Sequence, residues 1–291
     1  MRSIKSKSII AGTMNWGVWG VDMAVNHMAK HIAGVCELGI GAFDHADIYG
    51  GYTTEETFGA AFEATGIARE EVTFITKCGI QYPLNAKPGA VKHYDYSPAH
   101  IRNSCENSLR KLRTDYVDLL LLHRPSPLLN PREAIETLVA LQSEGKILNW
   151  GLSNFTPSQI QTMSLDGAPA WNQIECSITH TNPLTDGTLD THLSVGIGTM
   201  VWSPLGDVFK TPESEKSKRI REVLLGFEKK YQATAAQLLL SWLFKHPTSL
   251  IPVVGTTRLD RLKELNKSQE IELETNDWFA LLEASWGHKV P

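Results

Sequence analysis

The chain has 291 residues, of which 42% are hydrophobic and 21% charged, a composition typical of a globular protein with a large core. A net charge of −4 without dense runs of Lys or Arg argues against a nucleic-acid partner. The four cysteines form no CxxC pair, which disfavours a zinc knuckle or a disulfide framework. The N-terminal apolar stretch is much shorter than the roughly 18 residues of a membrane span, so we expect no membrane partner and a cytoplasmic location.

Eight short apolar runs alternate along the chain with longer segments of helical period. This alternation predicts parallel strands wrapped by helices. Each run is apolar on both sides, as expected of strands that are covered on both faces. The expected strands are Ile9–Thr13, Ala42–His45, Val72–Thr76, Val117–Leu122, Ile147–Leu152, Trp171–Glu175, Thr199–Ser203 and Leu250–Val254. We therefore predict an α/β fold, a (β/α)8 TIM barrel, as a single domain over residues 1–291.

The expected helices fill most of the intervals between the strands, and several start at Ser-Pro, Thr-Pro or Asn-Pro. They are Asp22–Leu38, Thr53–Glu63, Pro98–Leu112, Pro131–Ser143, Pro157–Met163, Glu215–Lys230, Ala233–Phe244 and Leu259–Asn266. After the sixth strand, the sequence shows no clear helical pattern. A C-terminal helix, Asn276–Trp286, is expected to lie over the barrel. The longest loops, Gly79–Ser97 and Leu205–Ser214, follow the third and seventh strands, where such barrels carry their active sites.

Titratable side chains gather at the ends of three successive predicted strands. Asp44 lies at the end of the second strand, and Tyr49 follows five residues later on the turn. Lys77 and His123 come directly after the third and fourth strands. Taken one at a time, three of them could have a purely structural role. Asp44 could cap the following helix, Lys77 could be a solvated surface lysine, and His123 could be a hydrogen-bonded structural histidine. Because the carboxyl ends of barrel strands share one rim, the four together indicate a site.

The chemistry of these four side chains favours proton delivery. A phenol with a pKa near 10 is a weak acid at neutral pH unless a cation stabilises its phenolate. Lys77 is the available cation, and Asp44 would keep it charged. Tyr49 could then donate a proton to a carbonyl oxygen while His123 orients the same oxygen. The predicted reaction is acid-assisted reduction of a small aldehyde or ketone.

With these residues in place, the chain resembles the aldo-keto reductase family, in particular its bacterial oxidoreductases. Asp44–Gly50 matches the family's D-x-A-x-x-Y-G motif, and Lys77 and His123 follow at family-like distances. Four further segments match in order over nearly the whole chain: Gly151–Phe155, Asn172–Gln173, Trp202–Gly206 and Ile251–Thr257. The resemblance implies that the four residues form a catalytic tetrad with Tyr49 as the proton donor. A nicotinamide cofactor would lie across the barrel mouth, and no G-x-G-x-x-G motif is present.

The resemblance also implies which residues bind that cofactor. Ser153, Asn154 and Gln173 would hydrogen-bond the carboxamide beside Asp44, and Trp202 would stack on the nicotinamide ring. The remaining contacts would come from Thr13, Met14, Ser203, Leu205, Gly206, Gly255, Thr256, Thr257, Arg261 and Glu264. Because Arg261 is placed to pair with a 2′-phosphate, NADPH is the expected cofactor and NADH the alternative.

Two other functions stay open. Asp44, His45, Asp47 and His123 could bind a divalent metal in a barrel hydrolase, although no H-x-H spacing supports it. The reductase interpretation needs no metal. The third possibility is a regulatory subunit that senses a nicotinamide cofactor.

No motif in the sequence identifies the substrate. Trp16 and Trp19 could line its pocket or pack in the core, and Tyr82, His93 and Tyr94 lie on the long third loop. We expect a small-molecule carbonyl substrate and a monomer or small homo-oligomer.

Overall fold

The computed structural model of the chain describes residues 8–83, 90–164 and 167–291. These residues form two compact units. The N-terminal unit consists of Ile10–Gln173 with Gly255–Leu259, and the C-terminal unit consists mainly of Ile174–Val254 and Asp260–Pro291. The single domain expected over residues 1–291 stays a prediction.

Eight parallel strands close into a barrel in the order β1–β10–β9–β8–β7–β6–β3–β2, which confirms the predicted (β/α)8 fold. The strands are β1 (Ile10–Gly12), β2 (Ala42–Asp44), β3 (Thr73–Cys78), β6 (Val117–Leu122), β7 (Ile147–Ser153), β8 (Trp171–Glu175), β9 (Gly198–Trp202) and β10 (Ile251–Val254). All six residues of β6 are buried, as expected of a strand covered on both faces. Its one acid, Asp118, accepts hydrogen bonds from Arg69 Nη2 at 2.7 Å and from the Phe74 backbone N–H at 2.8 Å.

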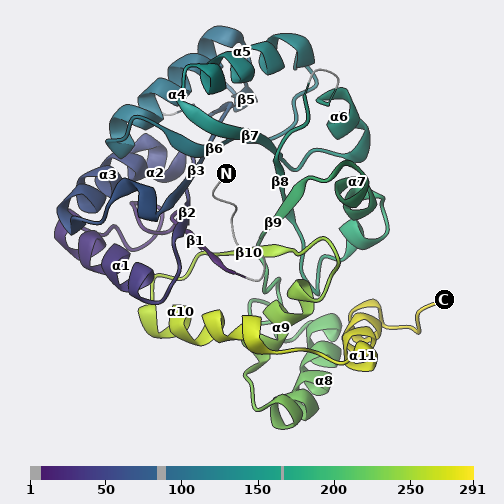
Figure 1. Ribbon diagram of the computed structural model, residues 1–291. Helices are drawn as coiled ribbons and strands as arrows, with labels where there is room; N and C mark the ends of the chain where they lie inside the picture. Colours follow the sequence, from purple (N-terminus) through teal and green to yellow (C-terminus); the bar gives the residue numbers. More distant parts are fainter. Residues whose placement is uncertain (1–7, 84–89, 165–166) are drawn as a thin grey trace. The chain divides into compact units, whose positions relative to one another are not determined.

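The helices of the N-terminal unit lie on the outside of its strands in Figure 1. They are α1 (Val25–Glu37), α2 (Tyr49–Tyr52), α3 (Thr54–Thr65), η1 (Arg69–Glu71), α4 (Pro98–Leu112), α5 (Pro131–Ser143) and α6 (Pro157–Thr162). The last three begin at the prolines predicted to start them, where a missing N–H costs nothing. Thr156 and Gln159 close a capping box at the start of α6. In Figure 1, α3 and α4 lie beside β3 and β6, and α5 lies beside β7.

An aromatic cluster joins these helices to the barrel. Phe58 of α3 lies with its ring centroid 5.3 Å from that of Phe43 on β2 and 5.4 Å from that of Phe74 on β3. Trp16 is fully buried against the rings of Phe43 and Phe58. Each such side chain contributes about 1.5–3 kcal/mol by leaving water. Of the two roles left open for Trp16, the structure therefore selects core packing.

The C-terminal unit contains most of the remaining helices. They are η2 (Asn182–Leu184), α7 (Thr188–Val195), α8 (Glu215–Tyr231), α9 (Ala235–Phe244), α10 (Leu259–Asn266, beginning at the boundary), η3 (Lys267–Glu270) and α11 (Thr275–Trp286). The predicted C-terminal helix is thus present as α11, and it packs against α8. The rings of Trp242 and Trp278 stack at 4.9 Å, and each indole N–H donates to the other residue's carbonyl, at 3.2 and 2.9 Å.

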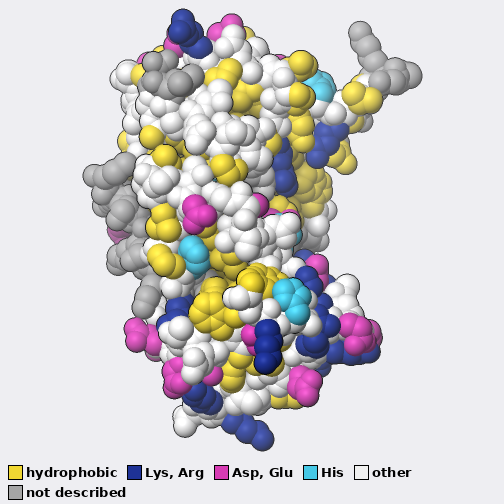
Figure 2. All heavy atoms as spheres, turned by 90° about the vertical axis from the view of Figure 1, so that its right-hand side faces the viewer, with side chains coloured by type: hydrophobic (Ala, Val, Ile, Leu, Met, Phe, Trp, Pro, Cys, Tyr) yellow, Lys and Arg dark blue, Asp and Glu magenta, His cyan; other side chains and the backbone are white. Residues whose placement is uncertain are grey.

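The surface of the C-terminal unit carries charges of both signs. In Figure 2, Lys and Arg side chains lie next to Asp and Glu side chains over the lower part, the level of α8 and α11 in Figure 1. Lys230 pairs with Glu274 at 2.9 Å and with Asp277 at 2.7 Å on this unit. On the face that Figure 2 shows, the described side chains thus mix positive and negative charge. None of the described helices has both the length and the hydropathy of a membrane span.

Three differences from the predicted elements bear on the site. Strand β3 runs on to Cys78, so Lys77 lies inside the strand and not after it. The expected loop Gly79–Ser97, of which residues 84–89 lie outside the described part, contains an antiparallel pair, β4 (Ile80–Gln81) and β5 (His93–Tyr94). Helix α7 was not predicted because six of its eight residues, two Thr with one Asp, His, Ser and Val, are weak helix formers.

Candidate active site

The register of the sheet brings Asp44 and Lys77 together. Asp44 is the last residue of β2 and pairs with Ile75 of β3. Lys77 lies two residues further along β3, on the same face of the strand because side chains alternate. On the next strand Lys77 pairs with Leu121, so that His123 follows at the end of β6. Three neighbouring strands thus bring an acid, a lysine and a histidine to one end of the sheet.

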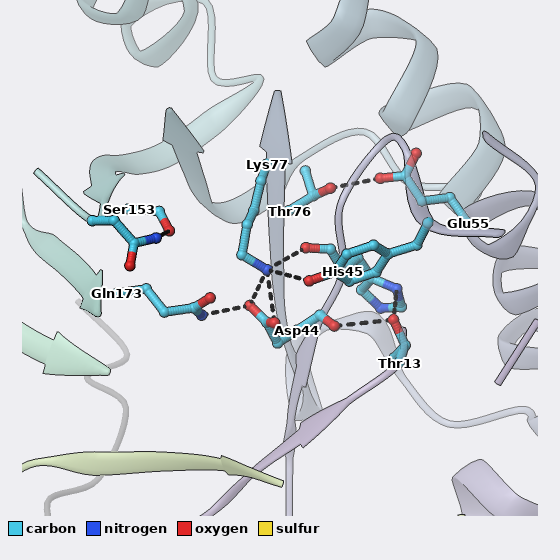
Figure 3. A network of polar contacts seen from close by, with 10 residues as sticks. Thr13, Asp44, His45, Glu55, Thr76, Lys77, Ser153 and Gln173 are labelled. Carbon is cyan, nitrogen blue, oxygen red and sulfur yellow. Dashed lines mark hydrogen bonds and ion pairs between the residues drawn. The ribbon is translucent and has the colours of Figure 1, made fainter. Parts of the chain in front are cut away.

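Lys77 is anchored by four oxygen atoms (Figure 3). Its Nζ donates to both carboxylate oxygens of Asp44 at 2.7 Å, to the carbonyl of His45 at 2.8 Å and to the Tyr49 hydroxyl at 3.3 Å. The lysine is 1% exposed and Asp44 3%. Burial lowers the pKa of Lys77, but Asp44 and Tyr49 raise it, and the pKa lies above its usual value of 10.5. Lys77 is therefore a cation at neutral pH.

Tyr49 is carried by a tight turn after β2. It begins the short element α2, in which Gly50 and Gly51 adopt φ of 59° and 64°. A Cβ on Gly50 would meet Thr54 Oγ1 at 2.4 Å, so this position requires glycine. Burial raises the pKa of Tyr49 above its usual value of 10, although Lys77 acts in the opposite direction. The phenol is therefore protonated at neutral pH.

His123 faces the phenol from the neighbouring strand end. Its ring centroid lies 6.1 Å from that of Tyr49, and its backbone N–H donates to the Cys78 carbonyl at 2.9 Å. Burial, followed by Lys77 and Arg124, lowers the pKa of His123 well below its usual value of 6.5. The imidazole is therefore neutral. Its buried Nδ1 has no hydrogen-bond partner within the described residues.

Gln173 makes a contact that sequence reasoning missed. Its Nε2 donates to Asp44 Oδ1 at 2.8 Å, so the carboxylate is held by a lysine on one side and an amide on the other (Figure 3). Asp44 and Gln173 lie 129 residues apart, and no local pattern signals their pairing. Ser153 ends β7 in register with Gln173, and Asn154 Nδ2 donates to Ser153 Oγ at 2.9 Å.

The other expected cofactor residues of the N-terminal unit lie on two loops. Thr13 follows β1 and is buried against Asp44, whereas the Met14 side chain is 45% exposed. Gly255 accepts a hydrogen bond from Asn15 Nδ2 at 3.4 Å, which joins the two loops. Thr256 and Thr257 are half-buried, and Thr256 Oγ1 accepts from the Arg258 N–H at 3.3 Å.

The remaining expected cofactor residues belong to the C-terminal unit. Trp202 ends β9 and is half-buried, and Ser203 follows with a φ of 51°. Leu205 is half-buried, and Gly206 has a φ of 56° and lies so close to Thr179 that a Cβ would meet its Oγ1 at 2.1 Å. Arg261 is exposed on α10. The Glu264 carboxylate accepts a hydrogen bond from Thr234 at 2.7 Å and so also has a structural contact.

The exposed side chain of Trp19 lies beside the phenol, and that of Tyr82 lies beside Trp19. The ring centroid of Trp19 is 6.2 Å from that of Tyr49 and 6.2 Å from that of Tyr82. Trp19 and Tyr82 are 42% and 45% exposed. Tyr82 is fixed through its backbone N–H, which donates to the Tyr52 hydroxyl at 3.1 Å. Trp19 therefore does not pack in the core, and its contact with substrate stays a prediction.

The polar atoms of the hypothetical metal cluster point to different partners. His45 Nδ1 lies 2.9 Å from Thr13 Oγ1, and Asp47 Oδ2 accepts a hydrogen bond from Ser104 at 2.7 Å. Asp44 is occupied by Lys77. In the described ranges no group of three or more His, Cys, Asp or Glu residues is arranged to hold a metal ion.

Comparison with known proteins agrees with this fold. The model of the Aldo/keto reductase family matches residues 8–285. The chain is 38% identical to the "Uncharacterized oxidoreductase YcsN" of Bacillus subtilis (strain 168) over 259 residues, 87% of this chain and 86% of that protein. It is 34% identical to "6-dehydroglucose reductase" of Agrobacterium fabrum (strain C58 / ATCC 33970), with 94% of each chain covered. The crystal structure of the thermostable aldo-keto reductase Tm1743 with the inhibitor epalrestat matches with a TM-score of 0.79 and 26% identity, over 95% of this chain and 94% of that one.

A parallel (β/α)8 barrel with titratable side chains at the strand ends defines a barrel enzyme. The chain belongs to the aldo/keto reductase family and is an oxidoreductase of that family.

Proposed function

We propose that the chain reduces an aldehyde or ketone to the alcohol with hydride from NADPH, and that Tyr49 delivers the proton. One observation carries the proposal: the Tyr49 hydroxyl lies 3.3 Å from a buried Lys77 ammonium that Asp44 holds in place. Because the ammonium donates to the phenol oxygen, the hydroxyl proton of Tyr49 is left to point toward a substrate carbonyl.

The donor set formed by Ser153 at the end of β7 and Gln173 in β8 fits a nicotinamide carboxamide. Ser153 supplies a hydroxyl, and Gln173 supplies an amide whose Nε2 is held by Asp44 while its Oε1 stays available as an acceptor. When bound, the cofactor supplies the hydride. Asn154, Trp202, Ser203, Leu205, Gly206 and the loop residues Thr13, Met14 and Gly255–Thr257 would complete its site. Arg261, with Glu264 nearby in sequence, would select the 2′-phosphate of NADPH over NADH.

His123 and Tyr49 have different roles at the carbonyl oxygen. His123 is a neutral imidazole, so it orients the oxygen through a hydrogen bond and does not act as the acid. As charge develops on that oxygen, Tyr49 transfers its proton, and Lys77 stabilises the phenolate that remains. General acid catalysis of this kind accelerates reactions by about 10²–10⁴-fold.

The direct test is oxidation of NADPH, followed by its absorbance, with a panel of aldehydes and ketones and with NADH in parallel. The panel includes sugar-derived aldehydes because two relatives bear the name 6-dehydroglucose reductase. Tyr49→Phe is expected to lower kcat by about 10²–10⁴-fold. Tyr231→Phe removes a hydroxyl bonded to Asp277 in the C-terminal unit and is the matched control, with wild-type kcat expected. Wild-type activity in Tyr49→Phe would refute the mechanism.

We also propose that the substrate is a small-molecule carbonyl compound. The proposed location is the cytoplasm, and the proposed state is a monomer or a small homo-oligomer.

A further inference from the structure

The histidine that follows Asp44 is fully buried and has no part in the reaction proposed above. The His45 ring lies between Phe58, at a centroid distance of 4.2 Å, and Phe74, at 6.0 Å. Its Nδ1 is 2.9 Å from Thr13 Oγ1, and its Nε2 is buried without a hydrogen-bond partner among the described residues. Burial of a polar group among apolar rings costs free energy unless the group forms a hydrogen bond.

The surrounding bonds determine which ring nitrogen carries the proton. Thr13 Oγ1 lies 3.0 Å from the Asp44 carbonyl and donates its single proton there. It must then accept from His45, which requires a proton on Nδ1. A proton on Nε2 would instead be a buried donor without a hydrogen-bond partner among the described residues, which is unfavourable. Burial, followed by Lys77 and Arg69, lowers the pKa of His45 to about 3, so the ring stays neutral.

The resulting chain of hydrogen bonds runs from His45 through Thr13 to the Asp44 carbonyl (Figure 3). The Asp44 carbonyl also accepts from the Thr13 N–H at 3.0 Å, and the next carbonyl, that of His45, accepts from Lys77 at 2.8 Å. The His45 side chain therefore restrains the two peptide groups whose orientation fixes both the Asp44 carboxylate and the Lys77 ammonium.

We propose that His45 is a positioning residue of this enzyme, which holds Lys77 and Asp44 in register with Tyr49 through the Nδ1–H bond to Thr13. It does so without touching substrate or cofactor. A misplacement of catalytic groups by about 1 Å can cost on the order of 10²-fold in rate, which sets the scale of the expected effect.

The first test reads the tautomer and needs no activity. In ¹⁵N-histidine NMR spectra of the whole chain, His45 is expected to show a protonated Nδ1 and a bare Nε2 between about pH 5 and pH 8. A signal assigned to His45 by comparison with His45→Asn that shows the Nε2–H tautomer, or titrates within this range, would overturn the proposal.

The second test separates positioning from folding. His45→Phe suits the aromatic surroundings but lacks the donor, and kcat is expected to fall about tenfold to a hundredfold with a change in carbonyl KM of less than about twofold. His45→Asn places an amide N–H near the Nδ1 position and is expected to restore most of kcat. The matched control is His192→Phe, which removes a similar buried bond, His192 Nδ1 to Thr199 Oγ1 at 2.8 Å, and is expected to keep the wild-type kcat.

Thr13→Val removes the other end of the bond and gives a second kinetic test if His45→Phe does not fold. Its kcat is measured at saturating NADPH, because Thr13 is also a proposed cofactor contact. Its kcat is expected to fall, and the double variant with His45→Phe, where it folds, should be no slower than the slower single variant. Wild-type kcat in folded His45→Phe or in Thr13→Val would overturn the proposal. The kinetic test rests on the proposed reductase function; a wild-type chain that reduces no carbonyl refutes that function, whereas the NMR result still decides the role of the bond.

Discussion

Replacing Lys77 by Met tests the central ion pair of the site. The substitution keeps most of the side-chain volume but removes the ammonium. Among the described residues, the side chain of Asp44, which is 3% exposed, would then keep only its bond to the Gln173 amide at 2.8 Å. Removing one partner of a buried ion pair lowers the free energy of unfolding by about 3–5 kcal/mol, because the other charge stays in the interior without compensation. For 291 residues the unfolding entropy is about 0.6 kcal/mol/K, which corresponds to a fall in Tm of about 5–8 °C.

The assay is thermal unfolding followed by circular dichroism at neutral pH. The control is Lys146→Met, because Lys146 forms ion pairs of 2.7 and 2.8 Å with Glu106 and Glu144 at the surface, where water screens such pairs and they contribute little to stability. The double variant Lys77→Met with Asp44→Asn removes the stranded charge and is expected to be more stable than Lys77→Met alone. Equal losses of Tm for Lys77→Met and Lys146→Met would refute the reasoning.

The pH dependence of the same pair has a defined sign. Asp44 and Tyr49 raise the pKa of Lys77 above 10.5, so the folded state holds this proton more tightly than the unfolded state. The stability contributed by the pair is therefore complete below pH 10.5 and is lost as pH rises through the folded pKa. In enzyme assays, Lys77→Met should lower kcat much more than it weakens cofactor binding, because Lys77 acts on the phenol.

Three further substitutions test other parts of the structure. Burial raises the pKa of Asp47 from 3.8 to about 7. The folded state therefore loses stability as pH rises through that range, because the unfolded state ionises Asp47 more easily than the folded state does. Asp47→Asn should therefore raise Tm more at about pH 8 than at about pH 4, and a gain that is equal at both would contradict the burial argument. Trp19→Ala should lower kcat/KM for ring-bearing aldehydes roughly two- to tenfold more than for small aliphatic ones, which Val18→Ala should not do. A Cβ at Gly59 would meet the Lys111 carbonyl at 2.1 Å, so Gly59→Ala should cost about 1–3 kcal/mol in denaturant unfolding. Gly226→Ala on α8, where a Cβ meets nothing within 4 Å, should instead stabilise by about 0.5–1 kcal/mol.

The sequence alone determined the architecture and the grouping of the four central residues. Strands buried on two faces must be apolar throughout, and prolines can start helices without losing a hydrogen bond, so both features are visible in local patterns. Asp44, Lys77 and His123 lie at one end of neighbouring strands because each stands at or near the carboxyl end of an apolar run.

Only the tertiary structure decided the partners of these residues. Gln173 reaches Asp44 across 129 residues, and Lys77 can lie inside β3 because Asp44 neutralises it there. His45 and Asp47 belong to the same segment as Asp44, yet they turn to Thr13 and Ser104. Periodicity determines which face of an element a side chain occupies, but hydrogen-bond partners depend on which elements the closed sheet places side by side. For that reason the sequence identified the site's components, and the packing of the strands determined how they are connected.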